Sequence, residues 1–137
     1  MDFNGVKVAL YIGDKLLIIE RDDIPTINYP GMWDLVGGGR EGDETPIQCA
    51  QREIKEELNL DLKEDDFVHQ RVYPSADFPG KIAVFLVAKI ASEIESEIVF
   101  GDEGQGWKLV TEEQFFAIDK IVPFLPPRLS DYLNDVK

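Results

Sequence analysis

The order of predicted strands and helices indicates an α/β fold, a layered domain with a mixed β-sheet. Three observations support this class. β-rich runs occur both early and late in the 137 residues, a helix with clear start and stop signals separates them, and no repeat or linker divides the chain. A chain of this length fits one domain, drawn over residues 1–137, and can bury roughly two-thirds of its unfolded surface.

The first part of the chain reads as a hairpin, a loop and a short strand. Two β-rich runs flank a Gly-Asp turn, at Val6–Ile12 and Leu16–Glu20. A loop rich in turn-forming residues follows, over residues 22–31. Trp33–Val36 is then predicted to be a short buried strand that ends at Gly37–Gly39. Three consecutive glycines leave the backbone free to approach a ligand closely.

A helix is predicted from Thr45 to about Leu58. Thr45 has the position of an N-cap, Pro46 suits the first helical residue, and Gln48 can complete a capping box. Asn59 should end the helix, because asparagine tolerates the left-handed conformation found just after a helix.

The rest of the chain alternates strands with helices. Strands are predicted at Phe67–Tyr73, Ile82–Ile90 and Trp107–Val110, and the second of these is apolar enough to lie inside a sheet. A second capping-box pattern at Thr111 predicts another helix, and a last helical segment is expected beyond Pro126-Pro127.

The charge of the chain excludes some partners. Fourteen Lys and Arg against twenty-seven Asp and Glu give a formal charge of −13, which repels nucleic acid polymers and acidic membrane surfaces. No apolar run is long enough for a membrane span, and the N-terminus lacks the pattern of a secretory signal. Cys49 is the single cysteine, which suits a reducing compartment, so we expect a cytoplasmic protein.

Three carboxylates share one face of the first predicted helix. At about 100° per residue, Glu53, Glu56 and Glu57 fall within one arc. An apolar stripe that would pack on the sheet runs beside them, at Ile47, Ala50, Ile54 and Leu58. Like charges at this spacing destabilise a helix unless a cation joins them, and carboxylates are ligands that Mg²⁺ or Mn²⁺ prefers. A solvated acidic face would show the same helix pattern, but the glycine run before the helix favours a metal site.

The spacing around this helix resembles the Nudix box, the signature of the Nudix hydrolases. Gly38 is followed by five residues, Glu44, seven residues, and the run from Arg52 to Leu60, Arg-Glu-Ile-Lys-Glu-Glu-Leu-Asn-Leu. Every fixed position of the box matches except Asn59, where the family usually has glycine. The resemblance implies a Nudix-type α/β/α sandwich with a mixed sheet, in which the box occupies residues 38–60.

The resemblance also implies roles for residues. Glu53, Glu56 and Glu57 would coordinate Mg²⁺, for which Mn²⁺ could substitute, together with the backbone carbonyl of Gly37. The general base would be Glu53 or, as an open alternative, Glu103 of a later acidic loop.

Three further residues have roles outside this metal set. Glu44 and Arg52 are read as a structural brace that ties the loop to the helix. Arg21, at the end of a strand, could bind a substrate phosphate, and a surface ion pair is equally compatible with its position. His69 is the only histidine, with no second ligand or nucleophile near it in the sequence, so a histidine-based mechanism is not expected.

The implied activity is hydrolysis of a phosphoanhydride bond in a nucleoside diphosphate derivative. A nucleoside triphosphate, including an oxidised dNTP, is the first expectation, cleaved to nucleoside monophosphate and pyrophosphate. ADP-ribose or a sugar nucleotide is the alternative, because Tyr73-Pro74-Ser75 faintly resembles the loop of ADP-ribose pyrophosphatases. A non-catalytic Nudix module that senses a nucleotide is the rival from another class. The partner is therefore a small nucleotide, and the sequence leaves open whether the chain forms a homodimer.

Overall fold

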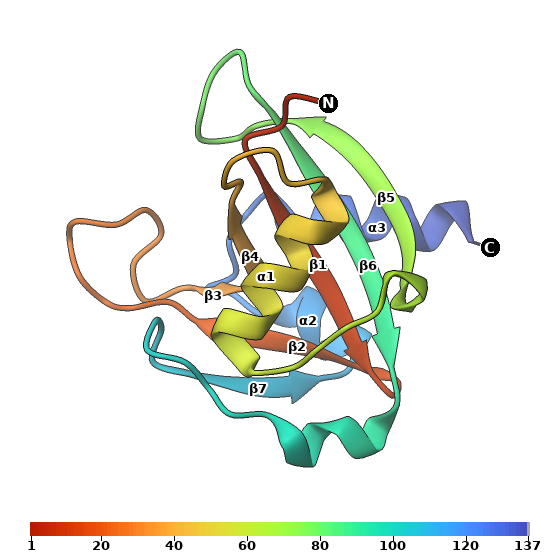
Figure 1. Cartoon of the computed structure of the whole chain (residues 1–137). Coiled ribbons are helices and arrows are strands. Elements are labelled where there is room, and N and C mark those ends of the chain that lie inside the picture. The colour runs from red at the N-terminus through yellow and green to blue at the C-terminus, as the bar shows by residue number, and fades with distance from the viewer. Residues whose placement is uncertain (137) are drawn as a thin grey trace.

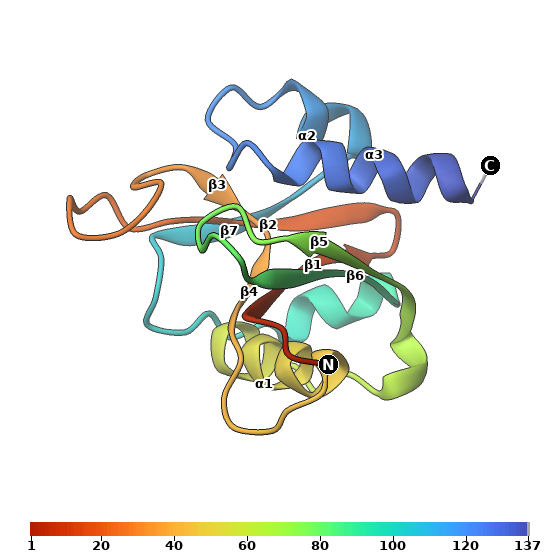
Figure 2. The same ribbon diagram turned by 90° about the horizontal axis from the view of Figure 1, so that it is seen from above.

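The computed structural model describes residues 1–136 and contains one seven-stranded mixed sheet between two helical layers (Figures 1 and 2). The strands are β1 (Gly5–Ile12), β2 (Lys15–Glu20), β3 (Trp33–Asp34), β4 (Val36–Gly39), β5 (Phe67–Pro74), β6 (Ile82–Ile90) and β7 (Gly106–Val110). The helices are α1 (Pro46–Leu58), α2 (Glu112–Ala117) and α3 (Leu125–Asp135), with 3₁₀ segments η1 (Glu64–Asp66) and η2 (Ser92–Glu97). In the view from above, α2 and α3 lie on one face of the sheet, and α1 and η2 lie on the other (Figure 2).

Strand β1 organises the sheet. One edge of β1 pairs in parallel with β6 along its whole length. The other edge is divided, because β4 pairs with Gly5–Val8 and β2 pairs with Tyr11–Ile12, both antiparallel. Two different strands therefore leave the same edge of β1, and β3 and β7 extend the sheet beyond β2.

Helix α1 forms as the capping residues predict. The Gln48 N–H donates to the Thr45 side chain at 3.2 Å, and the Thr45 N–H donates to the Gln48 side chain at 3.0 Å. Asn59 takes the left-handed conformation, with φ 57° and ψ 36°, and its N–H donates to the Lys55 carbonyl. The predicted apolar stripe is confirmed, since Ala50, Ile54 and Leu58 are fully buried against the sheet.

Alternating side chains of β1 fill two cores. Val6, Val8 and Leu10 point to the α1 side, whereas Ala9 and Tyr11 point to the α2 and α3 side. Each fully buried large aliphatic side chain contributes about 1.5–3 kcal/mol. The two cores hold the sheet between its helical layers, so the loops at the strand ends are built on a rigid base.

The structure differs from the sequence-based expectation at one strand, at the start of the last helix and in two 3₁₀ segments. The strand predicted at Trp33–Val36 is two strands, and the second continues through the glycines, which still offer N–H and C=O groups to β1. Helix α3 begins at Leu125 and includes both prolines, because the first-turn N–H groups that proline lacks have no helical acceptor. The segments η1 and η2 were not predicted. Within residues 1–136, no helix combines the length and the apolar character that crossing a membrane requires.

Candidate active site

Two of the three α1 carboxylates turn toward β4. The side chain of Glu53 is 13% exposed, and a Cβ atom placed on Gly38 would lie 2.5 Å from its Oε1 atom. Glycine at position 38 therefore makes room for this carboxylate. One turn later, Glu57 accepts a hydrogen bond from the Gly37 N–H at 3.3 Å. Glu56 faces outward, with its side chain 55% exposed.

Burial makes both inward carboxylates hard to ionise. Desolvation raises the pKa of Glu53 and raises the pKa of Glu57 to about 8, while the positive charge of Lys7 opposes the shift at Glu57. The two glutamates also repel each other's negative charge. A divalent cation beside them would supply the missing positive charge, and their hard oxygen donors fit Mg²⁺ or Mn²⁺.

Arg52 joins the loop to the helix. Its Nε and Nη2 atoms contact the two carboxylate oxygens of Glu44 at 2.6 and 3.1 Å, and Nη2 also donates to the Gly39 carbonyl at 2.7 Å. Its Nη1 atom contacts Glu53 at 3.0 Å and Glu56 at 3.3 Å. The hydrogen bonds from Arg52 lower the pKa of Glu44. This guanidinium therefore fixes the loop before α1 and the start of the acidic face at the same time.

A buried carboxylate holds two cations on the opposite wall. Asp34 is 4% exposed, and its Oδ2 atom contacts Lys7 Nζ at 2.8 Å and Arg21 Nη1 at 2.9 Å. Its other oxygen, Oδ1, accepts the Leu35 N–H at 2.7 Å. Both cations line the cavity, where their N–H groups suit phosphate oxygens, and the carboxylate of Asp22 lines it as well.

The late acidic loop is attached to the end of α1. The Val99 N–H donates to the Leu58 carbonyl at 3.0 Å, and the Gly101 N–H donates to the Glu57 carbonyl at 2.8 Å. These bonds satisfy carbonyls that the helix itself leaves unpaired at its end. They bring Glu103 close enough for its charge to raise the pKa of Glu53.

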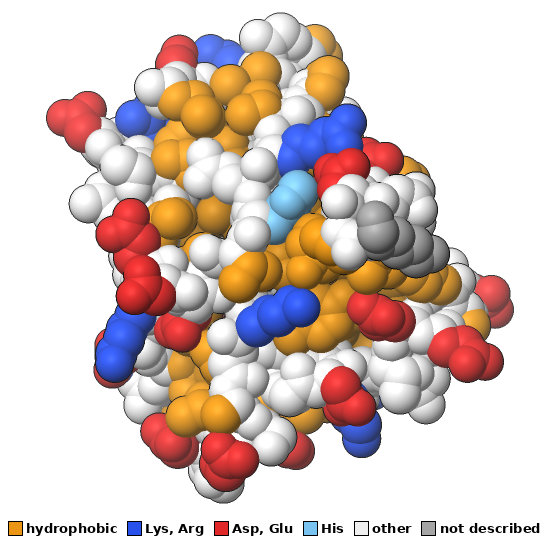
Figure 3. Space-filling view, turned by 90° about the vertical axis from the view of Figure 1, so that its right-hand side faces the viewer, with side chains coloured by type: hydrophobic (Ala, Val, Ile, Leu, Met, Phe, Trp, Pro, Cys, Tyr) orange, Lys and Arg blue, Asp and Glu red, His pale blue; other side chains and the backbone are white. Residues whose placement is uncertain are grey.

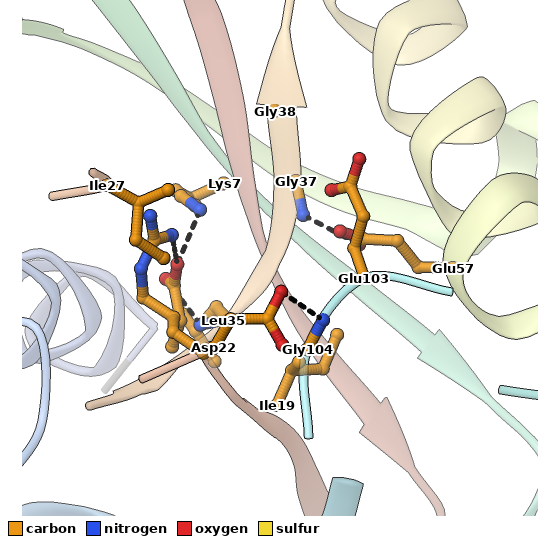
Figure 4. Close-up of a pocket in the computed structure, with 12 residues that line it drawn as sticks. Lys7, Ile19, Asp22, Ile27, Leu35, Gly37, Gly38, Glu57, Glu103 and Gly104 are labelled. Carbon is orange, nitrogen blue, oxygen red and sulfur yellow. Dashed lines mark hydrogen bonds and ion pairs between the residues drawn. The ribbon is translucent and has the colours of Figure 1, made fainter. Parts of the chain in front are cut away.

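These elements surround a cavity of about 440 Å³, at the place where β2 and β4 diverge from β1. Lys7, Arg21, Gly37, Glu57 and Glu103 are among the residues that line it. Figure 4 shows Glu57 and Glu103 entering from different elements toward Gly37, with Lys7 on the other side.

The structure thus brings four of the sequence-predicted site residues, Arg21, Gly37, Glu57 and Glu103, into one cavity. Glu53 lies at its edge against Gly38, whereas Glu56 is turned outward and paired with Arg52. Among residues 1–136, no three acidic, histidine or cysteine side chains are close enough together to form a finished metal site.

Sequence reasoning missed Lys7 and Asp34. Both are charged residues inside predicted apolar strands, and that contrast is the signal that could have identified them. His69 lies on β5, with its ring 4.9 Å from that of Tyr132, and is visible on the β5 side of the molecule in Figure 3.

Comparisons with known proteins find relatives that align with part of this chain. The dihydroneopterin triphosphate diphosphatase of Haemophilus influenzae is 38% identical over 63 residues, which are 44% of this chain and 37% of that protein. The nucleoside triphosphatase NudI of Enterobacter sp. strain 638 is 29% identical over 100 residues, 66% of this chain and 70% of that protein. The matched region is thus little more than a third of the length of the first relative.

The fold has close structural counterparts. The MutT protein of Methanosarcina mazei Go1 superposes with a TM-score of 0.77 at 17% identity, covering 99% of this chain and 96% of that one. The sequence model of the NUDIX domain matches residues 2–132, which include every strand and the box helix. The expected α/β class with a mixed sheet is confirmed, and the chain belongs to the Nudix family.

Proposed function

We propose that this chain is a Mg²⁺-dependent pyrophosphohydrolase that cleaves a phosphoanhydride bond in a nucleoside diphosphate derivative. The observation that supports it is the polarity of the cavity, with Glu57 of α1 and Glu103 of the late loop on one side and Lys7 and Arg21 on the other. Negative groups suit a metal ion, and positive groups suit the phosphates that the metal would help to bind.

Glu53 and Glu57 would hold the metal, with the Gly37 carbonyl and with Glu56 once its carboxylate leaves Arg52. When bound, a divalent cation neutralises phosphate charge and lowers the pKa of a coordinated water. Gly38 keeps the space that Glu53 needs, and Arg52 holds the helix against the loop.

The remaining steps belong to side chains of this protein. Arg21 and Lys7 would bind phosphate oxygens and orient the anhydride, and Asp34 positions both cations. Glu53 would accept the proton of the attacking water, because its carboxylate lies against Gly38 at the edge of the cavity, beside the metal that would hold that water. Glu103, which lines the same cavity, is the alternative base.

A nucleoside triphosphate is the first choice of substrate, and an oxidised dNTP belongs to that class. The relative named as a nucleoside triphosphatase supports this choice. ADP-ribose or a sugar nucleotide is the second, and a non-catalytic nucleotide sensor is the third. The cytoplasmic location expected from the single Cys49, which is buried, stays a prediction.

The test is a substrate panel assayed with Mg²⁺ and then with Mn²⁺. It should contain nucleoside triphosphates, oxidised dNTPs, ADP-ribose, sugar nucleotides and dinucleoside polyphosphates. We expect metal-dependent release of pyrophosphate from triphosphates and none in excess EDTA. Full activity in EDTA would contradict the metal assignment, and binding without turnover of any compound would favour the sensor.

A further inference from the structure

A second cavity, also of about 440 Å³, adjoins the first and shares Lys7 with it. It is formed by the start of β1, the loop between β5 and β6, and the first turns of α3. In Figure 1 this β5–β6 loop is the green loop next to the N-terminus. The charged side chains that line it are Lys7, Arg40, Asp77 and Arg128.

Arg128 is the unusual member of this set. It is only 6% exposed, and its guanidinium packs over the rings of Tyr73 at 4.7 Å and Phe124 at 4.5 Å. Its Nη2 atom donates one hydrogen bond, to the Pro74 carbonyl at 3.2 Å. Among residues 1–136 no carboxylate forms an ion pair with it, although a guanidinium has five N–H donors.

A buried charge without a partner is unfavourable, and desolvation lowers the pKa of Arg128. Arg128 lines the cavity with one hydrogen bond used, and the nearby acid that offsets the loss of solvation is Asp77, which lines the same cavity. The aromatic rings fix the guanidinium plane, so that its donors are preorganised for a ligand.

The other charges of the cavity point to an anion. Arg40 is held over Phe3 at 4.7 Å, and its nearest acid is Asp2, 3.6 Å away and 98% exposed. The one acid that lines the cavity, Asp77, accepts a hydrogen bond from Tyr29. Lys7 also lines the cavity but is paired with Asp34. The two arginines, Arg40 and Arg128, therefore share one lining carboxylate, in a protein whose formal net charge is −13.

We propose that this second cavity binds a phosphate monoester on the part of the substrate remote from the bond that is cleaved, with Arg128 as the recognising residue. A phosphate monoester carries nearly two negative charges, and its oxygens match the donor fork of a guanidinium. Lys7 lines both cavities, so the proposal places the scissile bond on one side of this residue and the remote phosphate on the other. The proposal rests on the proposed function, the hydrolysis of a nucleoside diphosphate derivative. Within that class it favours derivatives with an additional phosphate monoester over simple nucleoside triphosphates.

The experiment compares pairs of compounds that differ by one remote phosphate. Hydrolysis is measured for coenzyme A against dephospho-coenzyme A and for NADP against NAD, with Mg²⁺. Calorimetric binding is measured without metal for adenosine 3′,5′-bisphosphate and 2′,5′-bisphosphate against AMP. A hydrogen-bonded charge pair predicts roughly tenfold to a hundredfold preference for the phosphorylated member in kcat/KM or Kd.

Arg128→Met keeps the apolar stem and should abolish the preference, whereas Arg128→Lys should keep part of it. Arg71→Gln is the matched control, because Arg71 lies over the same Tyr73 ring at 5.3 Å but outside the cavity. Its preference should equal that of the unmodified protein. If Arg128→Met does not fold, Arg40→Gln tests the same cavity and should reduce the preference.

Equal kcat/KM and Kd within every pair would overturn the proposal, and so would a preference that survives in Arg128→Met. A failure of the proposed function looks different, since no compound would be hydrolysed. The metal-free binding preference and its loss in Arg128→Met would then still decide the second-cavity proposal.

Discussion

Glu57→Gln separates the role of charge in stability from its role in catalysis. Glutamine keeps the size of the side chain, and its amide oxygen can still accept the Gly37 N–H bond seen at 3.3 Å. The substitution removes one negative charge from the buried wall of the cavity. We expect the metal-free variant to be more stable than the unmodified protein at alkaline pH and to lose turnover by several orders of magnitude.

The size of the stability effect follows from the pKa of Glu57. Burial raises this pKa from 4.5 to about 8, so the folded protein holds a proton that the unfolded chain releases. Stability of the metal-free protein therefore falls as pH rises through that window. At about 1.4 kcal/mol per pKa unit, the full shift corresponds to an upper limit of about 5 kcal/mol. Glutamine cannot ionise and avoids this loss.

The assay is urea unfolding in EDTA at pH 5, 7 and 8.5, followed by the same titration in Mg²⁺. The free energy of unfolding of the variant should equal that of the unmodified protein at pH 5 and should exceed it by a growing margin toward pH 8.5. Mg²⁺ should stabilise the unmodified protein more than the variant, because a neutral amide is a poor ligand for a hard cation.

Glu56→Gln is the matched control, because it removes the same charge from a side chain that is 55% exposed. It should lose turnover without the alkaline gain in stability. Glu113→Gln, on exposed α2 surface, should change neither property. Near-normal metal-dependent turnover in both Glu56→Gln and Glu57→Gln would refute the metal assignment. If the stability of Glu57→Gln fell with pH as steeply as that of the unmodified protein, the argument from burial of Glu57 would be refuted.

Three further substitutions test the supporting structure. Gly38→Ala should lower turnover at least tenfold while the protein stays folded, because the new Cβ would lie 2.5 Å from Glu53 Oε1 and displace that carboxylate. Steady-state kinetics measure the turnover, and circular dichroism checks the fold. Asn59→Gly should leave turnover within a few-fold and raise the free energy of unfolding by a few tenths to about 1 kcal/mol, since position 59 is left-handed. Glu44→Gln should lower that free energy by about 1–3 kcal/mol. Arg52 lowers the pKa of Glu44, so the stabilisation that the Glu44 carboxylate gives the folded protein is complete above the ordinary carboxyl pKa. Below that pH the stabilisation declines, and the difference in free energy of unfolding between Glu44→Gln and the unmodified protein should shrink. Urea titrations at several pH values check this.

Local chemistry explains why so much of the fold could be predicted. The start and end of α1 depend on Thr45, Gln48 and Asn59, which act within one turn of the chain, so the sequence states them directly. The buried face of α1 follows from helical periodicity in the same way. The family follows from a spaced motif that lies in one continuous stretch, residues 38–60.

Tertiary structure decided everything that depends on segments distant in sequence. Sequence alone identified the carboxylates, but only the fold turned Glu53 and Glu57 inward and left Glu56 paired with Arg52. Asp34 meets Lys7 across 27 positions because β1 and the β3–β4 region converge, and no local pattern encodes that contact. Arg128 of α3 packs over the rings of Tyr73, which lies on β5, and Phe124, which is the N-cap of α3, so this contact joins segments about 50 residues apart. The sequence by itself determined the family, the helix and which carboxylates are proposed as metal ligands. The sheet determined which charged side chains are buried together, because burial and ion pairing depend on contacts between residues that are distant in sequence.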